Sequence, residues 1–160
     1  MRIGFAKDVH RLVRKRKLIL GGVEINYKKG LISYSDGDVV LHSLVDAIFG
    51  ALNIGDIGTI FPDNNSRYHN CSSLYFLKEA SKKIEENKCT VSYIDIFISC
   101  EEPKLKPYVE FMKLNIAQTL NIDIKRVSIK VGTNERLGYI GRKRGIEAFS
   151  AVLLNEMEDK

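Results

Sequence analysis

The sequence predicts a single α/β domain, an α+β sandwich in which helices cover one face of a mixed β-sheet. Segments typical of strands alternate with amphipathic segments typical of helices along the whole chain. The 160 residues, 44% of them hydrophobic and 28% charged, are enough for one domain with a sizeable core. Residues 1–160 contain no internal repeat, linker or low-complexity tract, so one domain is expected over this range.

The N-terminal part of the chain predicts two strands followed by a helix. Residues 2–10 and 18–26 are expected to form the strands, with a basic loop between them. The Gly21-Gly22 pair in the second segment indicates a bulge or a close backbone approach. Residues 39–52 are strongly apolar and are preceded by Asp38, a good N-cap residue, so a helix is expected there.

The middle of the chain predicts a loop and a second helix. Residues 53–65 are rich in Gly, Pro, Asn and Asp, which is typical of a mobile surface loop. In residues 72–87, Phe76, Ala80 and Ile84 recur at helical spacing. An amphipathic helix is therefore expected over this second range.

The C-terminal part predicts two more strands and two more helices. Three consecutive apolar residues at 96–98 indicate that residues 93–99 form a largely buried strand. Pro107 begins a segment with apolar side chains at helical spacing. Residues 127–131 are predicted to form another strand, and residues 145–158 a closing helix.

The charge distribution favours an anionic ligand. The net charge is +5, and basic residues gather at 11–17 and 142–144, which suits nucleic acid, a membrane surface or a small phosphorylated substrate. A solvated loop is the alternative for the first cluster. No aromatic residues are interleaved with it, which argues against single-stranded nucleic acid. No apolar run is long enough to span a bilayer, so no membrane partner is expected either.

The cysteines and the N-terminus suggest a compartment. Cys71, Cys89 and Cys100 are odd in number and lack C-x-x-C spacing, so they are expected to be reduced intracellular thiols. Residues 1–4 resemble neither a signal peptide nor a transit segment. A cytoplasmic location is expected, or an organellar one if a targeting peptide has been removed.

Two histidines and one aspartate form the first candidate site. Asp8 and His10 are two residues apart, so on a strand both side chains point to the same face. His42 follows the acidic Ser35-Asp36-Gly37-Asp38 turn at the start of the predicted helix, and Asp46, four residues later, is a candidate to support its imidazole. One carboxylate and two imidazoles suit a zinc ion with an open fourth position. A surface strand pair is the alternative reading of Asp8 and His10.

Two further segments suit phosphate groups. The strand end at Lys130-Val131-Gly132-Thr133-Asn134-Glu135 could present backbone N–H groups to phosphate, and Glu135 could hold a hard cation such as Mg²⁺. A capped turn is the slightly favoured alternative. In residues 100–107, two lysines stand between two prolines in a loop that could meet a phosphate or a base edge; a solvated connection is the alternative.

Taken together and in order, these motifs resemble the 2-C-methyl-D-erythritol 2,4-cyclodiphosphate synthase family of the non-mevalonate isoprenoid pathway. The resemblance covers essentially the whole chain, and the number of ordered matches makes it specific. The matching segments are Asp8-Val9-His10-Arg11, Ser35-Asp36-Gly37-Asp38, Leu41-His42, Asp46-Ala47, Gly55-Asp56-Ile57-Gly58, Phe61-Pro62-Asp63, Pro103-Lys104-Leu105, Thr133-x-Glu135 and Leu137-Gly138.

The resemblance implies an activity and an assembly. It implies a phosphorus-oxygen lyase that converts 4-diphosphocytidyl-2-C-methyl-D-erythritol 2-phosphate into the cyclodiphosphate and CMP. It also implies a homotrimer with its active sites between subunits. A Zn²⁺ ion would be bound by Asp8, His10 and His42, and a Mg²⁺ or Mn²⁺ ion near Glu135 would bridge the substrate diphosphate.

The resemblance also implies which residues contact the substrate. Tyr34 and Thr133 stand at catalytic positions, although the family usually has His where this chain has Tyr34. Cytidine contacts map to residues 100–106 and 132–133, from the neighbouring subunit. The complete substrate-binding set is Asp8, Val9, His10, Tyr34, Ser35, Asp56, Ile57, Gly58, Phe61, Pro62, Asp63, Asn64, Asn65, Cys100, Glu101, Glu102, Pro103, Lys104, Leu105, Lys106, Gly132, Thr133, Asn134, Glu135, Tyr139 and Arg142.

Two other functions are weighed against the cyclase. A zinc-dependent hydrolase of a phosphoanhydride would use an open zinc site to activate water. A basic nucleic-acid-binding protein would use the cluster at 11–17, and its binding would depend steeply on salt. Both are held below the cyclase, with a small cytidine diphosphate substrate as the expected partner and no nucleic acid.

Overall fold

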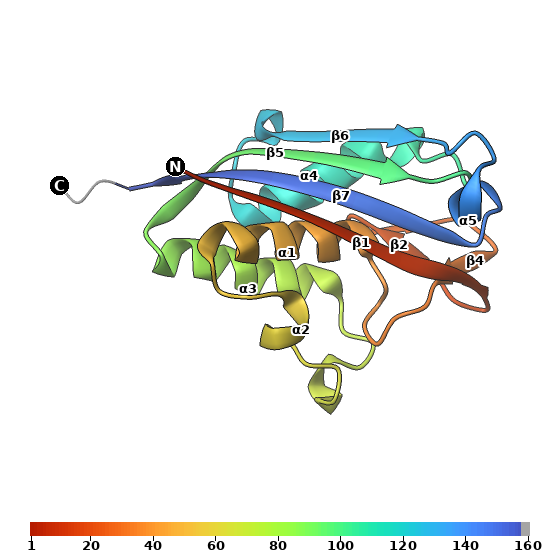
Figure 1. The fold of residues 1–160 in the computed structure, drawn as a ribbon, viewed down its shortest axis with the longest axis horizontal. Helices are drawn as coiled ribbons and strands as arrows, with labels where there is room; N and C mark the ends of the chain where they lie inside the picture. The colour runs from red at the N-terminus through yellow and green to blue at the C-terminus, as the bar shows by residue number, and fades with distance from the viewer. Residues whose placement is uncertain (158–160) are drawn as a thin grey trace.

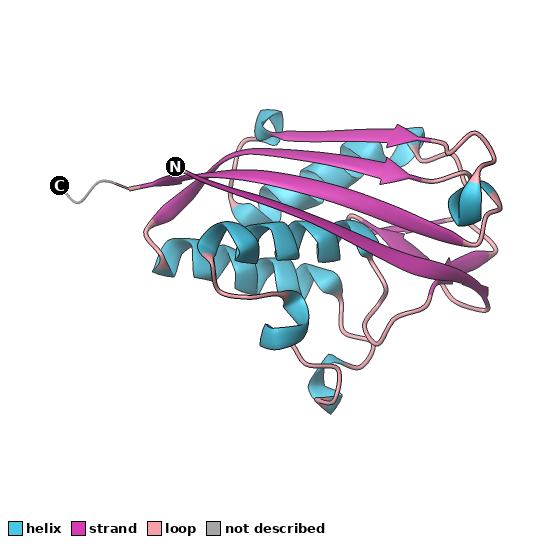
Figure 2. Ribbon diagram, viewed as in Figure 1, coloured by secondary structure: helices cyan, strands magenta, loops and turns pink. Residues whose placement is uncertain are grey.

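The protein is built on a five-stranded mixed sheet with its long helices on one side (Figures 1 and 2). The structure is a computed structural model and describes residues 1–157. The strand order is β4-β1-β7-β5-β6, with β5 and β6 parallel and the other neighbours antiparallel. The strands are β1 (Arg2–Arg14), β4 (Lys29–Leu31), β5 (Cys89–Ser99), β6 (Val127–Gly132) and β7 (Gly145–Glu156).

The remaining elements are helices and one small hairpin. The hairpin pairs β2 (Leu18–Leu20) with β3 (Val23–Ile25). The long helices are α1 (Val39–Leu52), α3 (Ser73–Glu86) and α4 (Val109–Leu120). The short ones are α2 (Ile57–Ile60), α5 (Gly138–Gly141) and the 3-10 turns Ser66–Tyr68, Lys106–Tyr108 and Ile124–Arg126.

The core lies between the sheet and the three long helices, as the predicted sandwich requires. Helix α1 packs against β1 and β7, while α3 packs against α1 and α4 (Figure 1). Ile94, Ile96 and Ile98 of β5 point into this core at every second residue. Helix α1 approaches β1 so closely that a Cβ at Gly4 would overlap the carbonyl oxygen of Ala47. The prediction of a mixed sheet covered on one face is confirmed.

The predicted closing helix is wrong, because residues 145–156 form the central strand β7; position 158 of that prediction lies outside the described residues. β7 pairs with β1 on one side and with β5 on the other. Its residues Ile146, Ala148, Ser150, Val152 and Leu154 are buried at every second position. Local composition favours a helix here, but pairing on both edges decides the conformation.

The predicted N-terminal strands are present with different bounds. β1 continues to Arg14, so the basic turn is shorter than expected. The single strand expected at 18–26 is two short strands joined by a tight turn at Gly21 and Gly22, whose φ angles are 57° and 72°. A Cβ at Gly21 would lie 2.6 Å from the Cβ of Met112, so the expected close backbone approach is confirmed.

The helices at 39–52, 72–87 and after Pro107 are confirmed within one or two residues. The segment at 53–65 is not a loop throughout, because it contains α2 and the buried side chain of Phe61. The Phe61 ring packs at a tilt against that of Phe76 of α3, with the ring centroids 4.8 Å apart, which holds this segment against the helices. Strand β4 was not predicted; its three residues are too few to give a period.

The face of the sheet opposite the long helices carries exposed apolar side chains. We call this the outer face and define it by Ile3, Phe5, Val9, Tyr93 and Phe97, which are 39–75% exposed. They point away from the core because side chains alternate along β1 and β5. No helix in the described part of the chain has the length and hydrophobicity that a bilayer crossing requires. An exposed patch of this kind is typical of a protein–protein interface.

Candidate functional site

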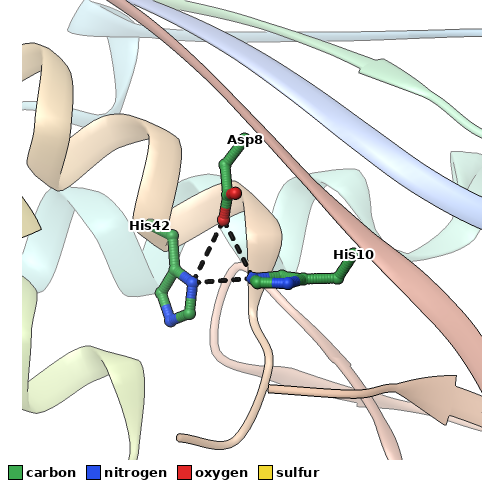
Figure 3. Close-up of side chains that lie close together, drawn as sticks. All are labelled: Asp8, His10 and His42. Carbon is green, nitrogen blue, oxygen red and sulfur yellow. Dashed lines mark hydrogen bonds and ion pairs between the residues drawn. The ribbon is translucent and has the colours of Figure 1, made fainter. Parts of the chain in front are cut away.

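Asp8 and His10 of β1 converge with His42 of α1, which is more than thirty residues away in the sequence (Figure 3). His10 Nε2 lies 2.9 Å from Asp8 Oδ2, and His42 Nδ1 lies 3.1 Å from the same oxygen. The two ring nitrogens are 3.0 Å apart. In a tetrahedral zinc site with bonds of 2.0–2.1 Å, neighbouring donor atoms are about 3.3 Å apart. The three side chains therefore form a cluster that could hold a metal ion, as the sequence predicted.

Two elements hold this cluster. Asp8 and His10 alternate with Val9 and Arg11 along β1, so both turn toward α1. His42 lies in the first turn of α1, whose start is fixed by Asp38: its carboxylate accepts the N–H groups of Val40 and Leu41. The site is thus attached to an inner strand of the sheet and a buried helix.

The electrostatics of the cluster favour a cationic occupant. Burial by itself would raise the pKa of Asp8, but the His10 and His42 rings beside its carboxylate lower it below the ordinary value. Burial would lower the pKa of His42, yet the neighbouring Asp8 carboxylate raises it. The carboxylate therefore stays ionised and attracts positive charge, from a proton or a metal.

The other nitrogen of the His42 ring faces two hydroxyl groups. Nε2 lies 2.9 Å from Ser35 Oγ and 2.9 Å from Ser73 Oγ. Asp46 does not support the His42 ring as expected, because its carboxylate accepts the backbone N–H of Ile57 at 2.6 Å. Asp46 thus fixes the start of α2, and the two serines contact the imidazole in its place.

A cavity of about 190 Å³ opens beside the cluster. It has room for a phosphate group and its neighbouring atoms. Nine of the predicted site residues line it: Asp8, His10, Tyr34, Ser35, His42, Ile57, Gly58, Phe61 and Asp63. The sequence did not indicate its other lining residues as substrate contacts: Asp46 was expected to support His42 and Phe76 to pack in the core, while Ser33 and Tyr68 were not singled out. Phe76 belongs to the apolar stripe of α3, which gives no signal of a site.

Part of the predicted set lies near the cavity without lining it. Asp56 is the N-cap of α2 and accepts the N–H of Thr59 at 2.7 Å. Pro62, Asn64 and Asn65 follow Phe61 on the surface, where the carbonyl of Asn65 accepts the Tyr34 hydroxyl at 3.4 Å. Val9 points to the outer face, although its backbone N–H donates to Asp8 at 2.8 Å.

The residues predicted to contact cytidine form a second group, at the ends of β5 and β6. These strands are parallel, so the segments that follow them, residues 100–106 and 132–135, lie side by side. The Cys100 N–H donates to the Gly132 carbonyl at 2.9 Å, and the Asn134 N–H donates to Glu101 at 3.2 Å. None of these residues lines the cavity beside Asp8.

Glu135, the predicted second cation ligand, belongs to this second group. Its carboxylate accepts the Thr133 hydroxyl at 2.8 Å. Glu135 and Arg136 have φ angles of 49° and 64°, a left-handed conformation that costs energy in non-glycine residues. Strain of this kind clusters at binding sites.

Tyr139 and Arg142, the last predicted contacts, lie at and just after α5. The Tyr139 hydroxyl donates to Glu147 at 2.7 Å, and Lys7 forms an ion pair with the same carboxylate at 2.9 Å. Burial would raise the pKa of Glu147, but these two partners lower it. Tyr139 is therefore tied to the outer face, away from the cavity beside Asp8.

Comparison with known proteins agrees with this geometry. The 2-C-methyl-D-erythritol 2,4-cyclodiphosphate synthase of Alkaliphilus metalliredigens is 47% identical over 156 residues, covering 98% of both chains. The IspF CDP complex of Plasmodium falciparum superposes with a TM-score of 0.86 at 38% identity, covering 98% of this chain and 97% of that one.

A longer relative contains a matching part. The bifunctional IspDF of Campylobacter jejuni superposes with a TM-score of 0.94 at 42% identity; the match covers 98% of this chain but only 42% of that one. The family model described as the YgbB family matches residues 1–155. On these grounds, the chain belongs to the YgbB family.

Proposed function

We propose that the protein is a 2-C-methyl-D-erythritol 2,4-cyclodiphosphate synthase, a phosphorus-oxygen lyase of the non-mevalonate isoprenoid pathway, with residues 1–160 as its single catalytic domain. The observation that carries the proposal is the convergence of Asp8, His10 and His42 beside a phosphate-sized cavity, in a chain of this family. The relatives named above support the reaction. The CDP bound in the Plasmodium falciparum protein supports a cytidine nucleotide substrate.

In the proposed reaction, an oxygen of the substrate's 2-phosphate bonds to the β-phosphorus. The bond from the β-phosphorus to the oxygen bridging it to the α-phosphate breaks, and CMP leaves with that oxygen. Both reacting groups are anionic, so catalysis consists mainly of alignment and charge neutralisation. A Zn²⁺ ion held by Asp8, His10 and His42 would neutralise phosphate charge when bound.

The protein side chains would align the reacting groups. Ser35 and the Tyr34 hydroxyl border the cavity and can donate hydrogen bonds to phosphate oxygens. Asp56, Gly58 and residues 61–65 would hold the methylerythritol unit. Burial of His42, only 6% exposed, keeps bulk water away from one side of the site and favours cyclisation over hydrolysis.

The second group would complete the site of a neighbouring subunit. Residues 100–106 and 132–133 would bind cytidine, and Glu135 would hold Mg²⁺ or Mn²⁺. Two observations support a homotrimer: this group does not line the cavity of its own chain, and the outer face is apolar and exposed. Tyr139 and Arg142 would act near the phosphate-bearing ligand or near the trimer axis. The free thiols of all three cysteines support a reducing compartment, such as the bacterial cytoplasm.

The first prediction concerns His42 and the reaction products. The wild-type protein should release CMP together with a cyclic diphosphate, and phosphorus NMR can identify both products. Release of CMP with a linear product would instead identify the zinc-dependent phosphoanhydride hydrolase. His42→Ala should lose bound zinc and more than about 10³-fold of kcat, because one of three ligands is gone. His69→Ala, at an exposed histidine outside the cluster, should keep its zinc. Full activity of metal-stripped His42→Ala would contradict the assignment.

A further inference from the structure

We infer that Ser73 and Asp36 are positioning residues for the metal centre: they hold the proton of the His42 ring on Nε2 and leave Nδ1 free to bind metal. This inference rests on the proposed zinc site and deepens it. Ser73 is the first residue of α3, and Asp36 lies in the acidic turn before α1. Neither residue lines the cavity, so neither is expected to touch substrate.

Asp36 sets the direction in which the Ser73 hydroxyl donates its hydrogen bond. Its Oδ2 accepts the backbone N–H of Ser73 at 2.9 Å, and its Oδ1 accepts the backbone N–H of Asp38 at 3.1 Å. The Ser73 hydroxyl lies 2.5 Å from Oδ1. An ionised carboxylate only accepts hydrogen bonds, so the single hydroxyl proton of Ser73 must point to Asp36.

This direction fixes the tautomer of His42. Ser73 Oγ lies 2.9 Å from His42 Nε2, and its own proton is already donated to Asp36. The contact is therefore a hydrogen bond only if the ring carries its proton on Nε2 and donates it. The neutral ring then has a bare lone pair on Nδ1, the atom that faces Asp8 and His10.

The second serine is compatible with the same arrangement. Ser35 Oγ also lies 2.9 Å from His42 Nε2 and accepts the N–H of Gly37 at 3.3 Å. Its own proton can go to Ser33 Oγ, 3.4 Å away. Ser35 can therefore accept from the ring as well, but no carboxylate fixes its proton. Of the two serines, only Ser73 has a hydroxyl whose donor direction is fixed by a carboxylate.

The surroundings make this arrangement rigid. Ser73 is fully buried and His42 is 6% exposed, so water could not easily replace the Ser73 hydroxyl as a partner of the His42 ring. The N-cap residue of α3, Ser72, makes no side-chain capping bond, and the Asp36 carboxylate takes a first-turn N–H instead. One carboxylate therefore fixes both the start of α3 and the hydroxyl that contacts His42.

Zinc affinity provides the main test. Loss of a partner that orients a histidine ligand typically costs 10–100-fold in metal affinity. Ser73→Ala should weaken zinc binding by about that factor, measured on metal-free protein by competition with a chromophoric chelator. The matched control is Ser43→Ala, which removes an equally buried hydroxyl on α1 that contacts Ser150 instead of the cluster. Its zinc affinity should stay within about twofold of wild type. An equal affinity for Ser73→Ala would overturn the inference.

The tautomer can be observed without zinc. Long-range nitrogen–proton NMR of metal-free protein, at an alkaline pH where the ring is neutral, should show the proton of His42 on Nε2. In Ser73→Ala, the form with the proton on Nδ1 should gain population. A wild-type ring protonated on Nδ1 would refute the inference, whether or not zinc binds. If the tautomer is as inferred but wild type binds no zinc, the proposed function fails instead.

Asp36→Asn provides a second variant of nearly the same volume. Asp36 acts through Ser73, so the variant that combines Asp36→Asn with Ser73→Ala should bind zinc no more weakly than Ser73→Ala alone. Additive losses of zinc affinity would contradict a role of Asp36 through Ser73. Circular dichroism of the metal-free proteins checks folding. If Ser73→Ala does not fold, Asp36→Asn still tests the inference, because a wild-type zinc affinity and tautomer in this variant would overturn it.

Discussion

At the residue scale, Tyr34 is one of the positions where this chain differs from the pattern of the family it resembles. The Tyr34 side chain borders the cavity, its hydroxyl reaches the carbonyl of Asn65, and its ring meets that of His69 edge-on at 5.3 Å between centroids. A tyrosine hydroxyl can donate to a phosphate but carries no positive charge near neutral pH. In the proposed reaction, Tyr34 would therefore supply one neutral hydrogen bond.

The second prediction follows from this limit. Tyr34→Phe should lower kcat about 10-fold, which corresponds to about 1.4 kcal/mol for one hydrogen bond. Tyr34→His should keep kcat equal or raise it, because an imidazole can donate and can also be cationic. Steady-state CMP release measures both. A drop larger than 10-fold in Tyr34→His would show that tyrosine has a specialised role here.

At the element scale, Asp38 joins the hairpin to the start of α1. Its side chain is fully buried and accepts four backbone N–H groups, those of Val40, Leu41, Gly21 and Gly22, at 2.7–3.2 Å. One carboxylate thus caps the helix that carries His42 and fixes the turn between β2 and β3. The acidic turn has a structural task as well as a place beside the site.

The third prediction measures that task. Asp38→Ala removes a cap worth about 1 kcal/mol and leaves buried N–H groups unpaired at about 1–3 kcal/mol. The free energy of unfolding should fall by about 2–4 kcal/mol in urea titrations at constant protein concentration. Asp123→Ala, which removes an exposed cap that accepts the Lys125 N–H, is the control and should lose less than about 1 kcal/mol. Equal losses in both variants would contradict the role of Asp38.

At the scale of the whole molecule, the outer face and the second group point to assembly. Phe5 is 68% exposed and stacks on Phe149 with centroids 6.4 Å apart, while the Lys7 ammonium lies 5.3 Å from the Phe149 centroid. Covering such side chains gains about 25 cal/mol for each Å² of apolar surface. A trimer would bury this face and bring the second group of one chain toward a neighbour's cavity.

The fourth prediction tests this assembly. Phe5→Glu places a charge in the proposed interface, so the trimer should dissociate toward monomers and lose activity. The control is Phe111→Glu, at a 60% exposed phenylalanine on α4, on the opposite side of the sheet. Light scattering after size exclusion should give a trimer mass for wild type and Phe111→Glu. A trimer of Phe5→Glu with wild-type affinity would exclude this face.

The sequence by itself indicated Asp8, His10 and His42 as a candidate metal site, and it predicted the three long helices. Residues such as Asp8 and His10 were found because strand alternation is local, and α1 was found because its cap and apolar run are adjacent in sequence. These signals need no knowledge of the rest of the chain.

Only the tertiary structure decided β7 and the contacts around the cluster. Residues 145–156 form a strand because β1 and β5 flank them, and no local pattern contains that information. Ser35 and Ser73 both contact His42 because α3 begins beside the acidic turn. The fold thereby brings together two serines that are 38 residues apart in the sequence (73 minus 35). Chemistry carried by neighbours in sequence is readable from sequence; chemistry created by packing is not.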